Sequence, residues 1–363
     1  MTSGNDTNPR YDVVVVGGGA AGLSGALALS RARRSVLVID GGRPRNAPAS
    51  RVHNYLGREG TPPEKLLAAG RAEAAAYGAE IVPGEAVSAE RLPDGFRVVR
   101  ADGTAVEARR LLVTTGLVDT LPPVEGLAER WGREVLHCPY CHGWEVRTRA
   151  IGILASGPMV VHQALLWRQW SDDVTLFLHT APEPSDEEYE QLAARGVAVV
   201  DGEATGLEVR DDRLTGVRLA GGTVVPREAL VVQTRMDARS GVLESLGVVP
   251  VAMEMGGQVI GTYVEADPMG ATGVPGVWVA GNVANLMEQV VGAAAAGLKA
   301  ASAVNMDLVA EETRRAVEAR RAPFSAEAER QVCARVLKDR RHGLETVRPE
   351  TTGPETTRQA ASR

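Results

Sequence analysis

Apolar and glycine-rich stretches alternate in a regular order between residues 11 and 40. A β-branched apolar run at 13–16 is followed by GGGAAG, by an apolar helical pattern, and by a second apolar run that ends at Asp40. A continuous apolar run of this length is typical of a strand buried on both faces of a parallel sheet. The segment therefore predicts strand, glycine turn, helix and strand, the opening unit of an α/β domain.

The same order of elements returns later in the chain. Residues 150–179 again predict strand, turn, helix and strand, and residues 96–116 predict a hairpin followed by another apolar strand. Residues 276–304 predict one more strand and a long helix of small residues. The Arg-rich stretch at about 313–341 has helical character, and the polar residues 345–363 are predicted to be disordered.

Part of the chain is repeated at a constant spacing. Six positions match without a gap, which indicates duplication of a nucleotide-binding unit. The first copy has Gly103, Thr104, Val106, Leu111, Val113 and Thr115, and the second has Gly222, Thr223, Val225, Leu230, Val232 and Thr234.

Composition and charge narrow the classes of protein. The 363 residues are enough for two domains, and a net charge of −6 gives no reason to expect nucleic-acid binding. The N-terminal segment lacks an apolar signal core, and no apolar run approaches ~20 residues, so we expect no membrane span and a cytoplasmic location. Three cysteines in such a compartment argue against a disulfide scaffold and favour a catalytic or metal-binding role for a close pair.

The first glycine turn, Gly17-x-Gly19-x-x-Gly22, directly follows a strand and opens a helix. In such a turn the first glycine permits the tight bend, the second lets a pyrophosphate approach the backbone, and the third allows close helix–strand packing. The helix N-terminus offers free amides to the phosphates. Asp40, at the end of the next strand, is placed to accept hydrogen bonds from a ribose, so the segment predicts a dinucleotide site.

Two cysteines form a C-x-x-C pair, Cys138 and Cys141, flanked by His137 and His142 in HCPYCH. Attachment of a c-type haem uses C-x-x-C-H, but it belongs to exported proteins, and we expect no export signal here. Zinc needs four tetrahedral ligands, which one hexapeptide supplies poorly, so we expect no metal. Two structural cysteines, or a dithiol that cycles with a disulfide, stay open on the residues alone.

Together these features resemble the low-molecular-weight thioredoxin reductase family. The resemblance rests on the glycine turn, the C-x-x-C pair, VTTG at 113–116 and GVWVAGNV at 276–283, and it covers about residues 10–305. It implies an α/β fold of two nucleotide-binding, Rossmann-like domains, the second inserted in the first. The implied segments are an FAD-binding domain at 1–119 and 247–312, an inserted degenerate NAD(P)-type domain with the cysteine pair at 120–246, and a helical extension with a tail at 313–363.

The same resemblance implies FAD as the cofactor. Asn282 stands where the family usually has Asp, and an amide can still hydrogen-bond a ribityl hydroxyl. The small-residue helix that starts near Gln289 would direct its dipole at the reduced flavin. Asn54 lies in an N-x-x-G stretch that passes close to the flavin in the family. The expected cofactor-binding residues are Gly17, Gly19, Ala21, Gly22, Asp40, Asn54, Gly116, Gly281, Asn282, Gln289 and Val290.

The second glycine turn departs from the family pattern. Aligned on the first turn, residues 152–157 place Leu154 where the middle glycine belongs, and its side chain would keep a pyrophosphate off the backbone. The next strand leads to His179 without the basic cluster that the family uses for a 2′-phosphate, and Gly116 becomes Arg235 in the second copy. We therefore expect that NADPH does not bind as the electron source, while a different nicotinamide site, such as one for NADH, stays open.

Within the family, H-C-x-x-C-H resembles the gliotoxin and holomycin dithiol oxidases, whereas thioredoxin reductases usually have CxxCD. The resemblance implies that Cys138 exchanges with substrate and Cys141 with the flavin, while His142 or His137 accepts the thiol proton. The implied reaction oxidises a small-molecule, natural-product dithiol to a disulfide, with O2 as acceptor and H2O2 as product. The implied assembly is a homodimer.

Two other functions stay open. One is an NAD(P)H-dependent disulfide reductase for a thioredoxin-like protein, which would need an intact second turn. The other is a flavoprotein whose cysteines report redox state. We expect His162 to pack in the core or at an interface rather than react, and Cys333 to be incidental.

Overall fold

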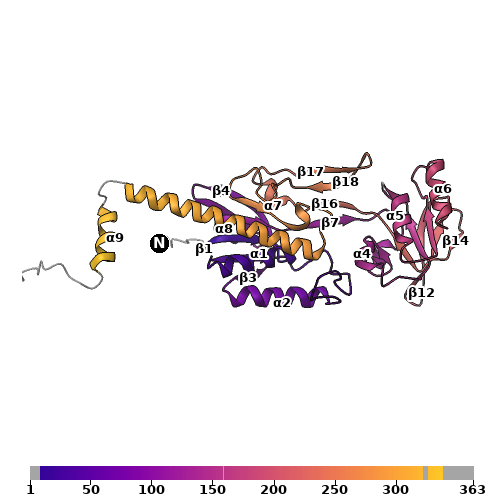
Figure 1. Ribbon diagram of the computed structural model, residues 1–363, viewed down its shortest axis with the longest axis horizontal. Helices are drawn as coiled ribbons and strands as arrows, with labels where there is room; N and C mark the ends of the chain where they lie inside the picture. Colours follow the sequence, from indigo (N-terminus) through magenta and orange to yellow (C-terminus); the bar gives the residue numbers. More distant parts are fainter. Residues whose placement is uncertain (1–8, 158, 322–325, 338–363) are drawn as a thin grey trace, which may run out of the picture. The chain divides into compact units, whose positions relative to one another are not determined.

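The structure is a computed structural model that describes residues 9–157, 159–321 and 326–337. It divides into two compact units, one within residues 1–307 and one within residues 308–363. Figure 1 labels the elements along the chain. No helix in the described part of the chain combines the length and the apolar character that a membrane crossing requires.

The first sheet of the larger unit has the strand order β3-β2-β1-β6-β5-β4, and β19 also pairs with β6. β1 runs parallel to β2 and β6, with Val16 opposite Ile39 on one side and Val113 on the other. Val13, Val14 and Val15 are fully buried, as predicted for a strand covered on both faces. The strands are β1 (Arg10–Val16), β2 (Val36–Asp40), β3 (Glu80–Pro83), β4 (Ala86–Leu92), β5 (Gly95–Arg100), β6 (Ala105–Val113) and β19 (Val277–Val279).

Small residues bring helices close to this sheet and to each other. A Cβ on Gly25 of α1 would lie 2.6 Å from the Leu112 side chain, and one on Gly297 of α8 would lie 2.0 Å from the carbonyl oxygen of Ala21. Close approach therefore needs glycine at both positions. The helices outside the inserted segment between β6 and β19, or next to its ends, are α1 (Ala20–Arg31), α2 (Pro63–Ala76), α7 (Gly241–Glu244), η1 (Gly281–Val283) and α8 (Val290–Arg321).

β6 is a single strand, whereas the sequence predicted the second strand of a hairpin and then a separate apolar strand. Its first half pairs antiparallel with β5, Phe96 opposite Ala108, and its second half pairs parallel with β19. The prediction of a separate apolar strand after the hairpin was wrong because one unbroken strand changes its neighbour. The repeated segment is broken, into β14 (Val224–Val225) and β15 (Ala229–Val231), and the intervening Pro226 cannot donate a ladder hydrogen bond.

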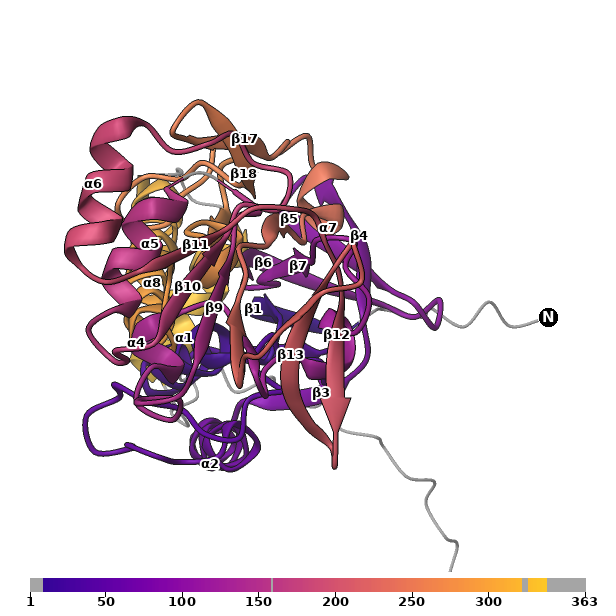
Figure 2. The same ribbon diagram turned by 90° about the vertical axis from the view of Figure 1, so that its right-hand side faces the viewer.

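A second sheet, of order β11-β10-β9-β15-β8, takes its strands from residues between those of the first sheet, and all its pairings are parallel. Ile151 and Ile153 face one core, and Leu154 faces the other. Figure 2 shows α5 and α6 on one side of these strands and β12 and β13 on the other. The elements are β8 (Val135–Leu136), β9 (Ile151–Leu154), β10 (Val174–Phe177), β11 (Ala198–Val200), β12 (Ala204–Arg210), β13 (Arg213–Leu219), α3 (Leu127–Arg130), α4 (Pro139–His142), α5 (Val160–Trp167) and α6 (Asp186–Ala194). The predicted fold class, one Rossmann-like unit inserted in another, is confirmed.

Two strands carry the chain into and out of the inserted unit. β7 (Leu117–Thr120) and β16 (Arg235–Ala238) pair antiparallel within a small sheet that also contains β17 (Val251–Met255) and β18 (Gln258–Tyr263). Because residues up to 307 form one compact unit, the domain boundaries expected after residues 119 and 246 stay predictions.

The helical character predicted at about 313–341 is found in the described residues, as the end of α8 and as α9 (Ala326–Leu337). Residues 322–325 and the segment predicted to be disordered, 345–363, lie outside the described residues.

Candidate active site

One cavity of about 1710 Å³ joins the first glycine turn to the cysteine pair. Ligand sites for single small molecules are typically about 300–1,000 Å³, so this cavity has room for a dinucleotide and a further molecule. Its lining includes most of the residues that the sequence singled out: Gly17, Gly19, Ala21, Asp40, Gly116, His137, Cys138, Cys141, His142, Gly281, Asn282, Gln289 and Val290.

The first glycine turn has the geometry that a pyrophosphate site requires. A Cβ on Gly19 would meet no atom within 4 Å, so the backbone there is open. Gly22 lies behind the turn, where a Cβ would be 1.9 Å from the carbonyl oxygen of Gly17. No side chain caps the N-terminus of α1, and its first turn carries no acidic residue, which leaves backbone amides for an anion.

Asp40 stands at the end of β2, beside this turn. Its Oδ1 accepts a hydrogen bond from the amide of Gly42 at 2.9 Å, and Arg71 Nη1 lies 3.4 Å from its Oδ2. Gly18 leaves room for this carboxylate, since a Cβ there would lie 2.3 Å from it. The carboxylate is therefore held where a ribose hydroxyl could donate to it.

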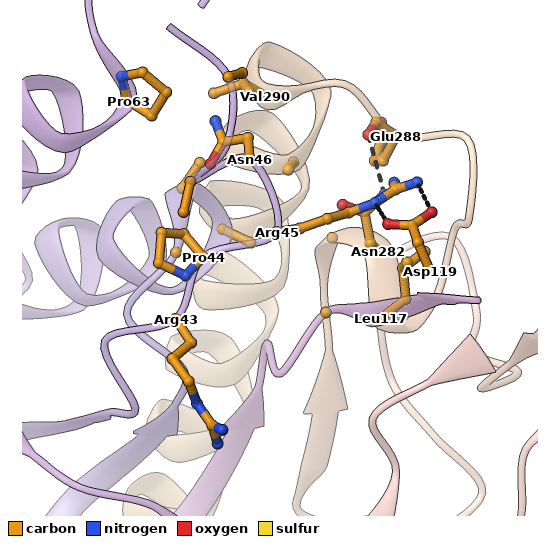
Figure 3. Close-up of a pocket in the computed structure, with 18 of the residues that line it drawn as sticks. Arg43, Pro44, Arg45, Asn46, Pro63, Leu117, Asp119, Asn282, Glu288 and Val290 are labelled. Atoms are coloured by element: carbon orange, nitrogen blue, oxygen red, sulfur yellow. Dashed lines mark hydrogen bonds and ion pairs between the residues drawn. The ribbon is translucent and has the colours of Figure 1, made fainter. Parts of the chain in front are cut away.

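Asn282 organises the loop that leads into α8 (Figure 3). Its Nδ2 donates to the carbonyl oxygens of Asn285, Leu286 and Glu288 at 3.1, 3.3 and 3.0 Å. Aspartate, the usual family residue, has no proton to donate here. The amide thus has a structural use that the sequence did not reveal, next to the start of α8 at Val290.

Cys138 and Cys141 form a disulfide across one helical turn, with their Cα atoms 5.3 Å apart. Pro139 starts the short helix α4, and the amides of Cys141 and His142 both donate to the carbonyl of Cys138 at 3.2 Å. The ring of Tyr140 meets that of Trp170 edge-on at 5.8 Å between centroids. A disulfide in a cavity wall supports the redox reading of the pair over a zinc or haem site, which would need free thiolates or thioether links.

His137 directly follows β8, next to the end of β15. Its Nδ1 lies 3.2 Å from the carbonyl oxygen of Val232, which can only accept, so Nδ1 carries the proton and Nε2 has the free lone pair. Burial lowers the pKa of His137 below its ordinary value, and the charge of Arg45 acts in the same direction. The ring is therefore neutral at pH 7 and can accept a proton at Nε2.

His142 closes α4 on the other side of the disulfide. Burial lowers the pKa of His142, while the carboxylate of Glu145 opposes the shift. This ring is also a neutral acceptor at pH 7.

Asn54 is not among the residues that line the cavity, although the adjacent His53 is. The Nδ2 of Asn54 donates to the carbonyl oxygen of Tyr140 at 2.6 Å. His53 lies 2.5 Å from Glu59 and 3.3 Å from Glu145. The loop thus reaches the cysteine turn of the inserted unit, and contact of Asn54 with the cofactor stays a prediction.

Two charged residues that the sequence did not single out, Arg45 and Asp119, meet in the cavity wall, and Thr234 of the repeated segment bonds to one of them. Arg45 donates from Nε and Nη2 to the two oxygens of Asp119 at 2.6 and 2.7 Å (Figure 3). Thr234 Oγ1 donates to the same carboxylate at 2.7 Å. Asp119 sits in an otherwise apolar connecting strand, LVDT, and that isolated charge was the signal available in the sequence.

The second glycine turn must be read three residues later than the sequence analysis placed it. Leu154 is the last residue of β9 and is fully buried, and it pairs with Phe177 as Val16 pairs with Ile39. The next amide, of Ala155, donates to Phe177 as that of Gly17 donates to Ile39, both at 2.9 Å. The counterpart of Gly17 is therefore Ala155, so the prediction that Leu154 replaces the middle glycine was wrong.

The residue that matches Gly19 in this register is Gly157. Its surroundings nevertheless differ, because a Cβ on Gly157 would lie 2.1 Å from Oε1 of Gln233. The counterpart of Asp40 is Leu178, which is buried and cannot accept from a ribose.

His162 and Cys333 complete the sequence candidates. His162 is exposed and lines the cavity with Gln163 and Leu166, on the face of α5 that these spacings share. It is therefore not in the core of this chain, and packing at an interface stays a prediction. Cys333 is a free cysteine in α9.

Comparison with known proteins agrees with this architecture. The family model described as pyridine nucleotide-disulphide oxidoreductase matches residues 11–297. Thioredoxin reductase tcpT of Claviceps purpurea is 29% identical over 84% of this chain and 96% of its own, and thioredoxin reductase sirT of Leptosphaeria maculans is 29% identical over 81% and 93%.

Two solved structures are similar over nearly their whole length. HlmI is 43% identical, with a TM-score of 0.78 over 90% of this chain and 98% of its own. An oxidoreductase from Agrobacterium tumefaciens is 33% identical, with a TM-score of 0.77 over 83% and 99%. FAD fits the residues present, because Gly19 is open, the α1 amides are uncapped, and Asp40 and the start of α8 line the same cavity. The chain therefore belongs to the pyridine nucleotide-disulphide oxidoreductase family, as an oxidoreductase of its FAD-binding, thioredoxin reductase-like group.

Proposed function

We propose that this protein is a dithiol oxidase that closes a disulfide in a small-molecule dithiol, such as a natural-product precursor, with O2 as the final acceptor and H2O2 as product. The observation that supports it most is the Cys138–Cys141 disulfide in the wall of the cavity that also contains the open glycine turn. His137 and His142, both with lowered pKa values because of burial, flank that disulfide.

The chain's own residues account for the oxidation of the substrate. One substrate thiol gives its proton to a neutral imidazole, and its thiolate attacks Sγ of Cys138; the Cys138–Cys141 bond breaks and Cys141 leaves as a thiolate. The second substrate thiol is deprotonated in turn and attacks the substrate sulfur that is bonded to Cys138. The bond between that sulfur and Cys138 breaks, and Cys138 leaves as a thiolate. The substrate loses two electrons and two protons, and the cysteine pair gains the two electrons.

Residues of the cavity would hold FAD beside the Cys138–Cys141 pair. Gly17, Gly19 and the first turn of α1 would receive its pyrophosphate, Asp40 its ribose, and the start of α8 the end that carries the flavin. Bound there, FAD would supply the two-electron chemistry that returns the cysteine pair to a disulfide and reduces O2.

We also propose that NADPH is not the electron source. The support comes from the second turn, where Gln233 covers the position that is open at Gly19 and Leu178 replaces Asp40. The rival function, a nicotinamide-driven disulfide reductase, is favoured by the names of relatives such as tcpT and sirT.

Anaerobic titration of the FAD-loaded protein tests both functions. We expect a small vicinal dithiol to bleach the flavin absorption, and air to restore it with release of H2O2, while NADPH and NADH leave it unchanged. Rapid bleaching by NADPH would instead establish the reductase. If neither the dithiol nor a nicotinamide bleaches the flavin, the function that stays open is a flavoprotein whose cysteines report redox state.

Cysteine variants identify the pair that reacts. We expect Cys138→Ser and Cys141→Ser each to keep the yellow FAD spectrum and to lose at least about a thousandfold in dithiol-dependent H2O2 formation, since neither can form the disulfide. Cys333→Ser is the matched control and should be fully active. An active Cys138→Ser or Cys141→Ser protein would sink the proposal.

A further inference from the structure

We propose that Arg45, held by Asp119, is a positioning residue for the dithiol reaction, and that the pair sets the charge state in which His137 works as a base. This inference rests on the proposed function, because it assigns Arg45 and Asp119 a part in the same reaction. Neither residue belongs to the cysteine–histidine motif itself.

The pair is built rigidly. Arg45 meets Asp119 through two donors, Nε and Nη2, in the fork geometry that fixes both planar groups. The Asp119 side chain is 7% exposed, and Thr234 occupies a further acceptor site on the same carboxylate. Burial alone would raise the pKa of Asp119, but the hydrogen bonds and charge of Arg45 hold that pKa below its ordinary value. Asp119 is therefore charged throughout the working pH range.

His137 is anchored on the same short segment as this pair. The carbonyl of Val232 accepts from its Nδ1, and Thr234, two residues later, donates to Asp119. The amide of Val232 in turn donates to the carbonyl of Leu136 at 2.8 Å, immediately before His137. The imidazole and the ion pair are thus fixed relative to one another by β8, β15 and the start of β16.

Charged or titratable groups from three elements act on the charge of His137. They are Arg45 from the loop after β2, Asp119 from β7, and His142 from α4; Arg239 lies beyond, within range of Asp119. Arg45 disfavours the imidazolium and Asp119 favours it, and the influence of Arg45 is the larger. If Arg45 lost its charge, the buried carboxylate would act alone and draw a proton onto His137. A protonated His137 cannot accept the proton of a substrate thiol.

The test uses two variants with opposite expected signs. In Arg45→Met we expect the pKa of His137 to rise. The acid limb of the pH profile for reduction of the Cys138–Cys141 disulfide by dithiol then moves up by about one pH unit. The reaction is roughly tenfold slower than wild type at pH 6 and recovers at high pH. In Asp119→Asn the carboxylate is lost while Arg45 stays charged, so the limb moves down. Arg45→Lys, which keeps the charge without the fork, should restore most of the profile.

A direct titration supplies a readout that does not depend on FAD or on turnover. The ring resonances of histidine-labelled protein, with His137 assigned from His137→Asn, should show the same two opposite shifts of its pKa. Arg218→Met, which removes an arginine of β13 that pairs with Glu125, is the matched control and should shift neither measurement.

The outcomes separate the two proposals. Opposite shifts in Arg45→Met and Asp119→Asn support the inference. Uniformly slower reaction with an unmoved profile, or shifts of the same sign, would overturn it and leave Arg45 a structural residue. If the wild-type disulfide reacts with no dithiol, the proposed function fails, and the histidine titration alone still decides whether Arg45 and Asp119 control His137.

Discussion

The amide of Asn282 is a single group on which a whole turn of the cavity wall depends. Its Nδ2 donates to three carbonyl oxygens, and in Asn282→Asp an oxygen would face those three oxygens instead. Unmet hydrogen bonds of buried groups cost about 1–3 kcal/mol, and Asn282 is half-buried, so we expect the variant to lose about 1 kcal/mol of stability. The lower urea midpoint of unfolding, followed by circular dichroism, measures the loss.

Asn285→Asp is the control for this prediction. Asn285 uses Oδ1 to accept from the amide of Met287 at 3.1 Å, and Asp retains that acceptor. Equal losses in the two variants would contradict the assigned role of Nδ2. The sequence pointed to Asn282 as a cavity residue, but the carbonyl partners lie on a turn whose conformation no local pattern encodes.

At the scale of elements, the disulfide turn α4 depends on its contact with the residues that follow α5. A Cβ on Gly143 would lie 2.8 Å from the ring of Trp170 and 2.6 Å from the carbonyl of Pro139. Because the carbonyl is backbone, we expect Gly143→Ala to displace the turn, to cost about 1–3 kcal/mol and to slow the reaction with dithiol. Gly221→Ala, where a Cβ meets nothing within 4 Å, should be neutral in both the unfolding and the stopped-flow measurement.

The second glycine turn shows where element-scale prediction from sequence ends. The strand–turn–helix–strand order of residues 150–179 was predicted correctly, since apolar runs and their spacing determine it. The register was wrong by three residues because Gly152 and Gly157 mimic the glycine spacing while lying on opposite sides of the strand end. Only the hydrogen bond from Ala155 to Phe177 shows where β9 stops. The covering of Gly157 by Gln233 depends on a side chain 76 positions away in sequence, which no motif contains.

At the scale of the whole molecule, the repeat predicted a second nucleotide-binding unit and the family resemblance implied its insertion, but the side-chain contacts between the two Rossmann-like units could not be predicted. Asn54 and Tyr140 are 86 positions apart, and Arg45 and Asp119 are 74 apart. Such pairs join segments far apart in the sequence, and no local pattern marks either member of a pair. The cysteine pair and its histidines were identifiable because they are adjacent in sequence, whereas the residues that set their charge are not.

An exposed apolar face of α8 is the surface on which we expect the homodimer to form. Val291, Leu298 and Met306 are 39%, 51% and 68% exposed on α8, at spacings that place them on one helical face. We propose that this face is buried against a second copy of the chain, because an exposed apolar row of this kind is typical of an association surface. Leu298→Glu should then convert a dimer to a monomer in size-exclusion chromatography with light scattering. Val224→Glu, an equally drastic change at an exposed valine of β14, should leave the dimer intact, and a wild-type protein that elutes as a monomer would rule the interface out.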